Sequence, residues 1–369
     1  MPIVNLISTG SHRPGEPIPN RTIEELAGHL PAEVLEGLQV TERHWIIDPV
    51  TGEHRTSNSR MAADAALHAL GRAGLEPADV DLVVVSTASP EFHLPAVSSL
   101  VLELLGIPEA TALDVRSGCA GFVQAMDIAR LQLEAGAARR ALVIGSEVIS
   151  PIVHPIYRGK EPGKVRMRDR ILAYTFGDGA GAVLLEASDG ADDGALPAGA
   201  GISGSVLRTV GGLRKPGMKI SGGATHAPLH EQQAARRLVD LYVDVVESGR
   251  FIPHMLTRSI QELLAATSTA AADVDLIVIP EGNAGYVTGE LEAAGLLTED
   301  WMALRDKVYE NIGSVGATGS AAVPLALDEA ASTGLLSEGD TLMLLAIETS
   351  KWTYAGMGLR WHGGAAWAA

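Results

Sequence analysis

The side chain best suited to covalent chemistry is Cys119, the only cysteine among 369 residues. It lies in Leu113-Asp-Val-Arg-Ser-Gly-Cys-Ala-Gly-Phe122, where a short apolar run gives way through small residues to a helical pattern. A thiol in the first turn of a helix faces unpaired N–H groups and the positive end of the helix dipole, and both favour the thiolate. Because glycines flank the cysteine and a helix follows, the segment predicts a catalytic nucleophile. The alternative is a small buried apolar residue, the common role of a lone cysteine.

A second candidate for function is a cluster of basic residues between positions 158 and 170, where only Glu161 and Asp169 carry negative charge. Pro162 and Gly163 interrupt the cluster, so we expect a loop that leads into a strand. Two interpretations stay open: a solvated surface loop, as most charge runs are, or a surface that docks an acidic partner. The basic residues are Arg158, Lys160, Lys164, Arg166, Arg168 and Arg170.

The composition excludes several classes of function. A formal net charge of −17 argues against binding DNA or RNA, since the field of the whole chain repels polyanions. No apolar run approaches the roughly 20 residues needed to cross a bilayer, and the first residues lack a signal-peptide pattern. A single cysteine forms no internal disulfide, and no Cys/His or acidic group has metal-site spacing. We expect a soluble, cytoplasmic protein that binds no nucleic acid, membrane or metal.

An internal repeat indicates the architecture that positions these residues. The segment Pro77-Ala-Asp-Val-Asp-Leu-Val-Val-Val85 is matched by Ala271-Ala-Asp-Val-Asp-Leu-Ile-Val-Ile279. A helical pattern precedes each copy, over Ser59 to Ala73 and over Pro253 to Ala266, and Gly74 suits the end of the first helix. Two halves therefore share one plan.

A further match joins Arg139–Glu147 to Gly339–Ile347, each an apolar strand after a helix. Continuous Val, Ile and Leu runs predict strands covered on both faces, and alternating helices indicate sheets with strong parallel character. The fold class is layered α/β. We expect an N-terminal half over 1–187 that carries the nucleophile, an exposed connection over 188–201, and a C-terminal half over 202–369.

Together, the repeated halves, the segment around Cys119 and Phe176-Gly-Asp-Gly-Ala-Gly-Ala-Val-Leu-Leu185 resemble the thiolase superfamily, most closely its ketoacyl-ACP synthase III group. The resemblance covers nearly the whole chain. It implies two duplicated α/β halves packed as a layered αβαβα body. It also implies a homodimer, in which Leu94 of one subunit closes the acyl pocket of the other. Because Phe176–Gly181 runs directly into a strand, we expect a structural turn there and not a dinucleotide site.

In this group a cysteine takes an acyl group from coenzyme A or acyl carrier protein, and a His and an Asn assist decarboxylative attack by a malonyl thioester. The resemblance assigns the first role to Cys119. The segment of the histidine reads Ile279-Pro-Glu-Gly-Asn-Ala284, which places Glu281 at the histidine position. The segment of the asparagine reads Gly316-Ala-Thr-Gly-Ser-Ala-Ala-Val-Pro324, which places Ala317 at the asparagine position.

These substitutions disfavour malonyl decarboxylation, because His and Asn donate hydrogen bonds to the oxygen on which enolate charge grows. An anionic Glu281 repels that charge but accepts a proton, so we expect a general base for an acidic carbon, an alcohol or an amine. The alternative is a carboxylate that only forms an ion pair or begins a helix. The family's glycine-rich tail turn reads Glu348–Trp352 here, and the backbone N–H groups of Cys119 and Ser350 are the expected oxyanion hole.

The hypothesis is an acyltransferase or condensing enzyme that loads Cys119 from the phosphopantetheine arm of an acyl carrier protein. No permanently bound cofactor is expected, and the basic cluster is the expected carrier-docking surface. The acceptor is a small molecule or a carrier-bound chain. Relatives in polyketide pathways suggest glyceryl and β-ketoacyl coupling to form tetronates. O- or N-acyl transfer, and a catalytically silent partner subunit of an active synthase, stay open.

Overall fold

The computed structural model describes residues 2–188, 201–234, 240–280 and 283–362, so positions 189–200 of the predicted connection lie outside the described residues. Within this part of the chain, two five-stranded sheets have the strand orders β1-β7-β6-β4-β5 and β12-β11-β13-β14-β8. The first contains β1 (Ile3–His12), β4 (Leu82–Ser86), β5 (Thr111–Val115), β6 (Arg140–Glu147) and β7 (Gly179–Ser188). The second contains β8 (Gly201–Thr209), β11 (Leu276–Val278), β12 (Val308–Tyr309), β13 (Thr341–Glu348) and β14 (Thr353–Arg360).

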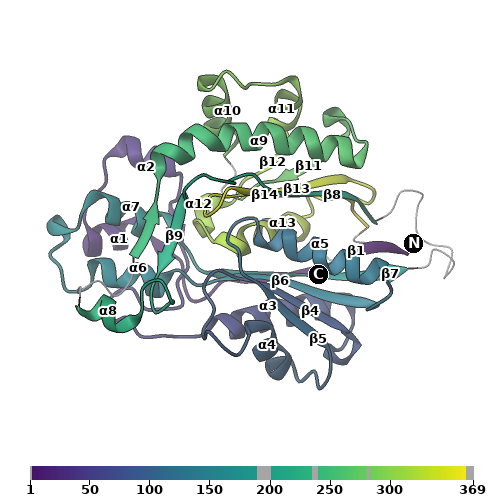
Figure 1. The fold of residues 1–369 in the computed structure, drawn as a ribbon, viewed down its shortest axis with the longest axis horizontal. Helices are drawn as coiled ribbons and strands as arrows, with labels where there is room; N and C mark the ends of the chain where they lie inside the picture. Colours follow the sequence, from purple (N-terminus) through teal and green to yellow (C-terminus); the bar gives the residue numbers. More distant parts are fainter. Residues whose placement is uncertain (1, 189–200, 235–239, 281–282, 363–369) are drawn as a thin grey trace.

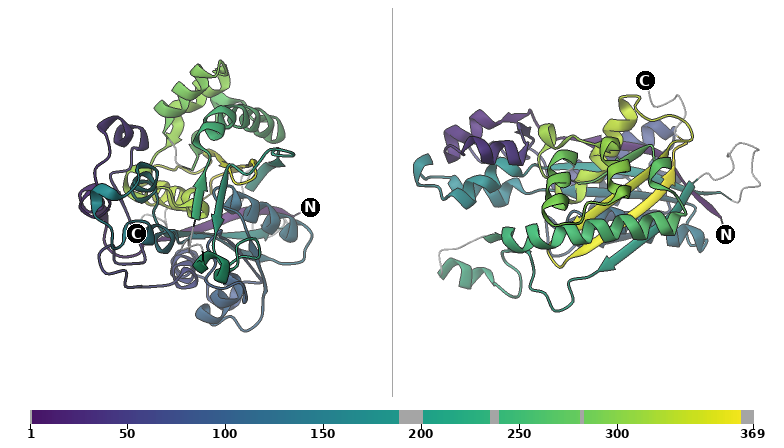
Figure 2. Two further views of the ribbon diagram at one scale, coloured as in Figure 1. Left: turned by 60° about the vertical axis from the view of Figure 1, so that its left-hand side comes forward. Right: turned by 90° about the horizontal axis from the view of Figure 1, so that it is seen from above.

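Helices and sheets alternate in five layers (Figure 1). Two helices lie between the sheets, and further helices cover each outer face, so the predicted αβαβα, thiolase-like fold is confirmed. Seen from above in Figure 2, α9 lies along the yellow strands of the second sheet. The central helices are α5 (Gly121–Glu134) and α13 (Ala322–Ser332), and the outer ones are α3 (Asn58–Ala73), α4 (Val97–Leu105), α9 (Val245–Thr267), α10 (Ala284–Ala293) and α11 (Glu299–Leu304).

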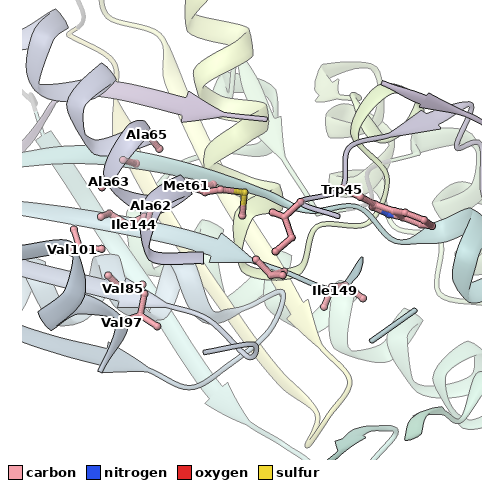
Figure 3. Close-up of a cluster of buried hydrophobic side chains, with 14 of the residues drawn as sticks. Trp45, Met61, Ala62, Ala63, Ala65, Val85, Val97, Val101, Ile144 and Ile149 are labelled. Atoms are coloured by element: carbon pink, nitrogen blue, oxygen red, sulfur yellow. The ribbon is translucent and has the colours of Figure 1, made fainter. Parts of the chain in front are cut away.

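Strand β4 shows why its continuous apolar run is required. Side chains alternate between the faces of a strand, so Leu82 and Val84 enter the core between the sheets, and Val83 and Val85 enter the core beneath α3 and α4. All four side chains are at most 1% exposed. Figure 3 shows Val85 in this outer core with side chains of α3 and α4. The prediction of strands covered on both faces is confirmed.

Each sheet is mixed, with the parallel pairings together at one edge. Strands β4, β5 and β6 are parallel, whereas β7 is antiparallel to both β6 and β1. The second sheet repeats this plan, with β11 parallel to β12 and β13, and β14 antiparallel to β13 and β8. The expected parallel character is therefore limited to three strands of each sheet.

The hydrogen-bonded strand pairs show which residues of the two halves occupy equivalent positions. Leu82 pairs with Ala141 in the first sheet, and its copy Leu276 pairs with Leu342 in the second. This register matches β6 to β13 over their full lengths, so that each strand ends at a glutamate, Glu147 or Glu348. The sequence comparison of Arg139–Glu147 with Gly339–Ile347 is therefore wrong by one residue.

The same offset relates the two central helices and the turns before them. Helix α5 begins at Gly121 and α13 at Ala322, so Gly-Cys-Ala before α5 corresponds to Gly-Ser-Ala before α13. Ser320 is consequently the structural counterpart of Cys119.

The remaining described elements lie to one side of the five layers (Figure 1). There the basic cluster differs from its prediction: a 3₁₀ turn (Pro162–Lys164) is followed by helix α7 (Met167–Thr175), not by a strand. Asp169 in the first turn of α7 is buried and favours a helix start. These elements are β2 (Ile18–Pro19), α1 (Asn20–Ala27), α2 (Ala32–Leu38), β3 (Glu42–Arg43), α6 (Ser150–Tyr157), α7, β9 (Met218–Ser221), α8 (Leu229–Ala234), β10 (Asp240–Val243) and α12 (Ile312–Val315), which contacts β3.

The predicted end of α3 agrees with the structure, whereas the predicted start of α9 does not. Helix α3 ends at Gly74, whose left-handed φ of 65° fits the predicted glycine stop. Helix α9 begins eight residues before the predicted start at Pro253, because Asp244 caps it by accepting the Glu247 N–H and the proline lies inside the helix. Among the described residues, no helix combines the length and apolar character needed to span a membrane.

Candidate active site

Cys119 lies in the turn that joins β5 to α5, just before the helix starts, as predicted. The turn is closed by the Gly121 N–H, which donates to the Gly118 carbonyl at 2.8 Å. The cysteine is half-buried. Since β5 and β4 are parallel, the turn stands at the carboxyl end of parallel strands, where α/β folds commonly bind ligands.

The small residues beside Cys119 let the turns of the two halves meet. A methyl group on Gly121 would lie 2.0 Å from the Ser86 Oγ and 3.2 Å from the Ser320 Oγ. A methyl group on Gly118 would lie 2.5 Å from the Glu348 Oε2. Glycine is needed at both positions, at Gly118 because Glu348 of the second half takes the space, and at Gly121 because Ser86 of the same half takes it and Ser320 of the second half lies close by.

The turn that contains Ser320 is hydrogen-bonded to the turn that contains Cys119, which is called the nucleophile turn after the predicted role of its cysteine. The Ser320 Oγ donates to the carbonyl oxygens of Ser117 and Gly118, both at 2.9 Å, and lies 3.1 Å from the Ser86 Oγ. The Ser320 N–H donates to the Glu147 Oε2 at 3.2 Å. Sequence reasoning missed Ser320, although the matching Gly-Cys-Ala and Gly-Ser-Ala strings are visible in the chain.

Glu147, at the end of β6, is a buried carboxyl group with several donors. Its Oε1 accepts hydrogen bonds from the Ala88 N–H at 3.0 Å, from the Thr87 hydroxyl at 3.3 Å and from the Ser89 hydroxyl. Burial raises the pKa of Glu147 to about 7, against the opposing effect of these donors, and the nearby charge of Glu348 adds to the rise.

Glu348, at the end of β13, is the equivalent carboxyl group beside the nucleophile turn. It is 2% exposed, and its Oε1 accepts the Ser350 N–H at 3.2 Å. Its Oε2 is buried against Gly118 and accepts no hydrogen bond from the described residues. Neither glutamate was predicted as part of the site, although both end the matched strands.

The predicted site residues of the second half fall at different places. Ser350 lies in the turn after β13, and its N–H donates a hydrogen bond to the Glu348 Oε1. Ala317 is 1% exposed; its N–H donates to the Thr175 carbonyl at 2.8 Å and its carbonyl accepts the Gly177 N–H at 3.0 Å. Glu281 lies outside the described residues.

Two further predicted features have clear locations. Leu94 is 86% exposed in the loop between β4 and α4, so its side chain is available to another surface. Phe176–Asp178 lead into β7, where the buried Asp178 accepts the N–H groups of Ile46 at 2.7 Å and Ile149 at 2.6 Å. The predicted structural turn over Phe176–Gly181 is therefore shorter than expected, because β7 begins at Gly179.

The six predicted docking residues do not form one uniform surface. Arg166 and Arg168 project at the start of α7 with side chains 78% and 47% exposed, and each pairs with Asp169. The guanidinium of Arg170 instead donates to backbone carbonyl oxygens within the chain, including those of Val165 and His29, both at 2.9 Å. The others are exposed: Arg158; Lys160, whose Nζ donates to the Ile156 carbonyl; and Lys164, which pairs with Glu161.

Comparisons with known proteins show the family and support the fold. A profile of 3-oxoacyl-[acyl-carrier-protein (ACP)] synthase III matches residues 113–204, and the profile of its C-terminal part matches residues 264–363. The chain is 31% identical over 349 residues to the β-ketoacyl-[acyl-carrier-protein] synthase III of Rhizobium meliloti (strain 1021), covering 90% of this chain and 96% of that protein.

Solved structures are similar over almost the whole chain. The tetronic acid condensing enzyme AbyA1 matches with a TM-score of 0.79 and 28% identity, covering 96% of this chain and 99% of that one. The priming β-ketosynthase of the R1128 polyketide pathway matches with a TM-score of 0.78 and 25% identity, covering 97% and 96% respectively.

The raised pKa of Glu147 predicts how stability depends on pH. A carboxyl group whose pKa rises from 4.5 to about 7 on folding binds its proton more tightly in the native state. Between pH 4.5 and about 7 the native state therefore binds more of this proton than the unfolded state does. The contribution of Glu147 to stability is fully present below pH 4.5 and is lost as the pH rises through about 7. Relative to Glu147→Gln, the wild type should lose on the order of 3 kcal/mol of unfolding free energy between pH 4.5 and 8.

Urea denaturation at several pH values measures this difference. Glu161→Gln, at an exposed position, is the control and should run parallel to the wild type. A constant gap between the wild type and Glu147→Gln across the pH range would contradict the assignment.

Proposed function

We propose that this chain, which belongs to the 3-oxoacyl-[acyl-carrier-protein] synthase III family, is a condensing enzyme that transfers an acyl group through Cys119 without malonyl decarboxylation. The observation that carries the proposal is that the side chain of Ala317 is a buried methyl group. The sequence resemblance aligns this residue with the family's asparagine. A methyl group donates no hydrogen bond to an enolate oxygen. Glu281 at the histidine position offers a carboxyl group in place of an imidazole.

The proposed first step is an exchange of thioesters. The Cys119 thiolate attacks the carbonyl carbon of a carrier-bound acyl thioester, and the tetrahedral oxyanion is stabilised by backbone N–H groups, including that of Cys119. The new S–C bond forms as the bond to the phosphopantetheine sulfur breaks. The arm leaves as a thiolate and takes up a proton from solvent.

The proposed second step uses an acceptor that is already acidic. Glu281 removes a proton from the carbon between the two carbonyls of a β-ketoacyl thioester. The resulting carbanion attacks the acyl carbonyl, a C–C bond forms, and Cys119 is released as a thiolate. No carbon dioxide leaves and no oxidant is needed, so the family's decarboxylation residues are not required.

Similarity to AbyA1 supports a tetronate-type reaction, in which a glyceryl thioester is joined to a β-ketoacyl chain. AbyA1 is described as a tetronic acid condensing enzyme, and it matches this chain with 28% identity. We extend that reaction class to this chain as a proposal. We also propose a homodimer, in which the exposed Leu94 enters the partner's acyl pocket.

An acyl carrier protein is the proposed donor of the acyl group. Carrier proteins are acidic, and this chain with its charge of −17 needs a local basic surface to attract one. Arg166 and Arg168 on α7 are the most suitable docking residues, because both side chains project into solvent. Arg170 is bound by backbone carbonyls and supports the segment from within.

Loading of Cys119 is the first prediction of this mechanism. Incubation with acyl-carrier thioesters should add the acyl mass to the wild-type protein and leave Cys119→Ala unmodified, as measured by intact-mass spectrometry. Cys119→Ser serves as a matched variant, and we expect little or no loading because serine is a weaker nucleophile. Absence of a Cys119-dependent adduct across glyceryl, acetyl and longer acyl carriers would support a silent partner subunit instead.

Glu281→Gln should separate loading from turnover. Because the proposed base acts only on the acceptor, acyl–Cys119 should form at a rate within about twofold of the wild type, and condensation should slow at least about a hundredfold. Glu292→Gln, at an exposed position of α10, is the control. Single-turnover mixing of the acylated enzyme with a β-ketoacyl thioester measures the second step, and wild-type turnover of Glu281→Gln would remove this residue from the mechanism.

Charge reversal at α7 tests the docking surface. Arg166→Glu with Arg168→Glu should raise the KM for a carrier-bound substrate by about tenfold and leave the KM for the matching free pantetheine thioester unchanged. Arg139→Glu, at a side chain 70% exposed on another element, is the matched control. Equal effects on both substrates, or none, would place carrier docking elsewhere.

A further inference from the structure

We propose that Ser320, the structural counterpart of Cys119, is a positioning residue that aims the Cys119 N–H into the oxyanion hole. The inference rests on the proposed function in one respect, that Cys119 forms the thioester. Beyond it, the inference assigns a role in the reaction to a residue of the opposite half of the chain.

The hydroxyl group of Ser320 is held within the contact between the two turns. It is 0% exposed and contacts the Ser117 and Gly118 carbonyl oxygens at 2.9 Å each. A hydroxyl group has one proton, so Ser320 shares it between the two carbonyls, and the Ser86 hydroxyl at 3.1 Å is left to donate to Ser320. Each polar atom of this contact is therefore satisfied by the other half.

Ser320 is itself held rigidly. Its N–H donates to Glu147, and its carbonyl oxygen packs so closely on β6 that a methyl group on Gly145 would lie 2.1 Å from it. Gly319 has a φ of +51°, a left-handed conformation that suits glycine and directs the chain across the Glu147 carboxylate. The serine hydroxyl therefore has a fixed position relative to the nucleophile turn.

Because the Gly118 carbonyl and the Cys119 N–H share one peptide unit, the hydrogen bond from Ser320 to that carbonyl also orients the Cys119 N–H. The Gly118 carbonyl and the Cys119 N–H belong to one planar, trans peptide unit, so they point in opposite directions. Ser320 and the Gly121 N–H both draw that carbonyl to one side of the turn. The Cys119 N–H is thereby directed to the other side, and this N–H is the expected oxyanion donor.

Comparing two reactions of the Cys119 thiol separates a role of Ser320 in the oxyanion hole from a general effect on the thiol. Acylation by a thioester passes through an oxyanion, whereas alkylation by iodoacetamide is a displacement at saturated carbon and forms none. Ser320→Ala should therefore slow acylation of Cys119 by at least about tenfold, with KM for the thioester unchanged, because a misdirected oxyanion donor weakens transition-state stabilisation alone. The alkylation rate should stay within about twofold of the wild type.

Ser98→Ala is the matched control, since Ser98 is also a fully buried serine and its Oγ has no partner among the described residues. Both rates should be unchanged in this variant. Stopped-flow acylation with a chromogenic pantetheine thioester and timed alkylation followed by intact mass provide the measurements. If Ser320→Ala does not fold, Ser320→Cys retains a weak donor and should show a smaller selective loss, with adducts located by peptide mapping.

The possible results separate the two proposals. A loss of acylation with retained alkylation supports the role of Ser320. Unchanged acylation, or an equal loss of both rates, overturns it. A wild-type enzyme that forms no acyl adduct would instead overturn the proposed function, independently of Ser320.

Discussion

The structure depends on two glutamates that end matched central strands and reach the glycine-led turn of the opposite half. Glu147 lies against Gly319, and Glu348 lies against Gly118, at distances that no side chain at either glycine would permit. This crossed contact means that the surroundings of each turn include a residue of the other half. A central helix also joins the two halves. Asp328 of α13, in the second half, accepts a hydrogen bond from the Thr9 hydroxyl of the first half at 2.6 Å.

Duplication produced two equivalent turns, but their surroundings make them chemically different. Ser320 is fully buried and gives its proton to backbone carbonyls, so it has no access to substrate. Cys119 is half-buried, and the neighbouring Gly118 lies against the Glu348 Oε2 of the second half, which has no donor among the described residues. One turn is therefore buried in the contact, and the other carries the thiol that the proposed function uses as the nucleophile.

The sequence predicted the parts of this arrangement that follow from local pattern. Apolar runs such as Leu82–Ser86 indicated strands covered on both faces, and Gly74 indicated a helix end, because each signal depends on neighbours in the chain. The pairing of Glu147 with the Ser320 turn joins residues 173 positions apart, and only the register of the strands brings them together. The strand expected after the basic cluster was wrong, because a buried Asp169 and tertiary contacts favour helix α7 there.

The buried carboxyl groups also bear on which carbanion this site tolerates. Loss of carbon dioxide from a malonyl thioester places the enolate charge on a single thioester oxygen, which needs strong donors close by. The carbanion of a β-ketoacyl thioester shares its charge between two carbonyl oxygens, so it depends less on any single donor and is less sensitive to nearby acidic groups. Two buried glutamates beside the Cys119 turn therefore favour the β-ketoacyl acceptor that we propose over a malonyl thioester.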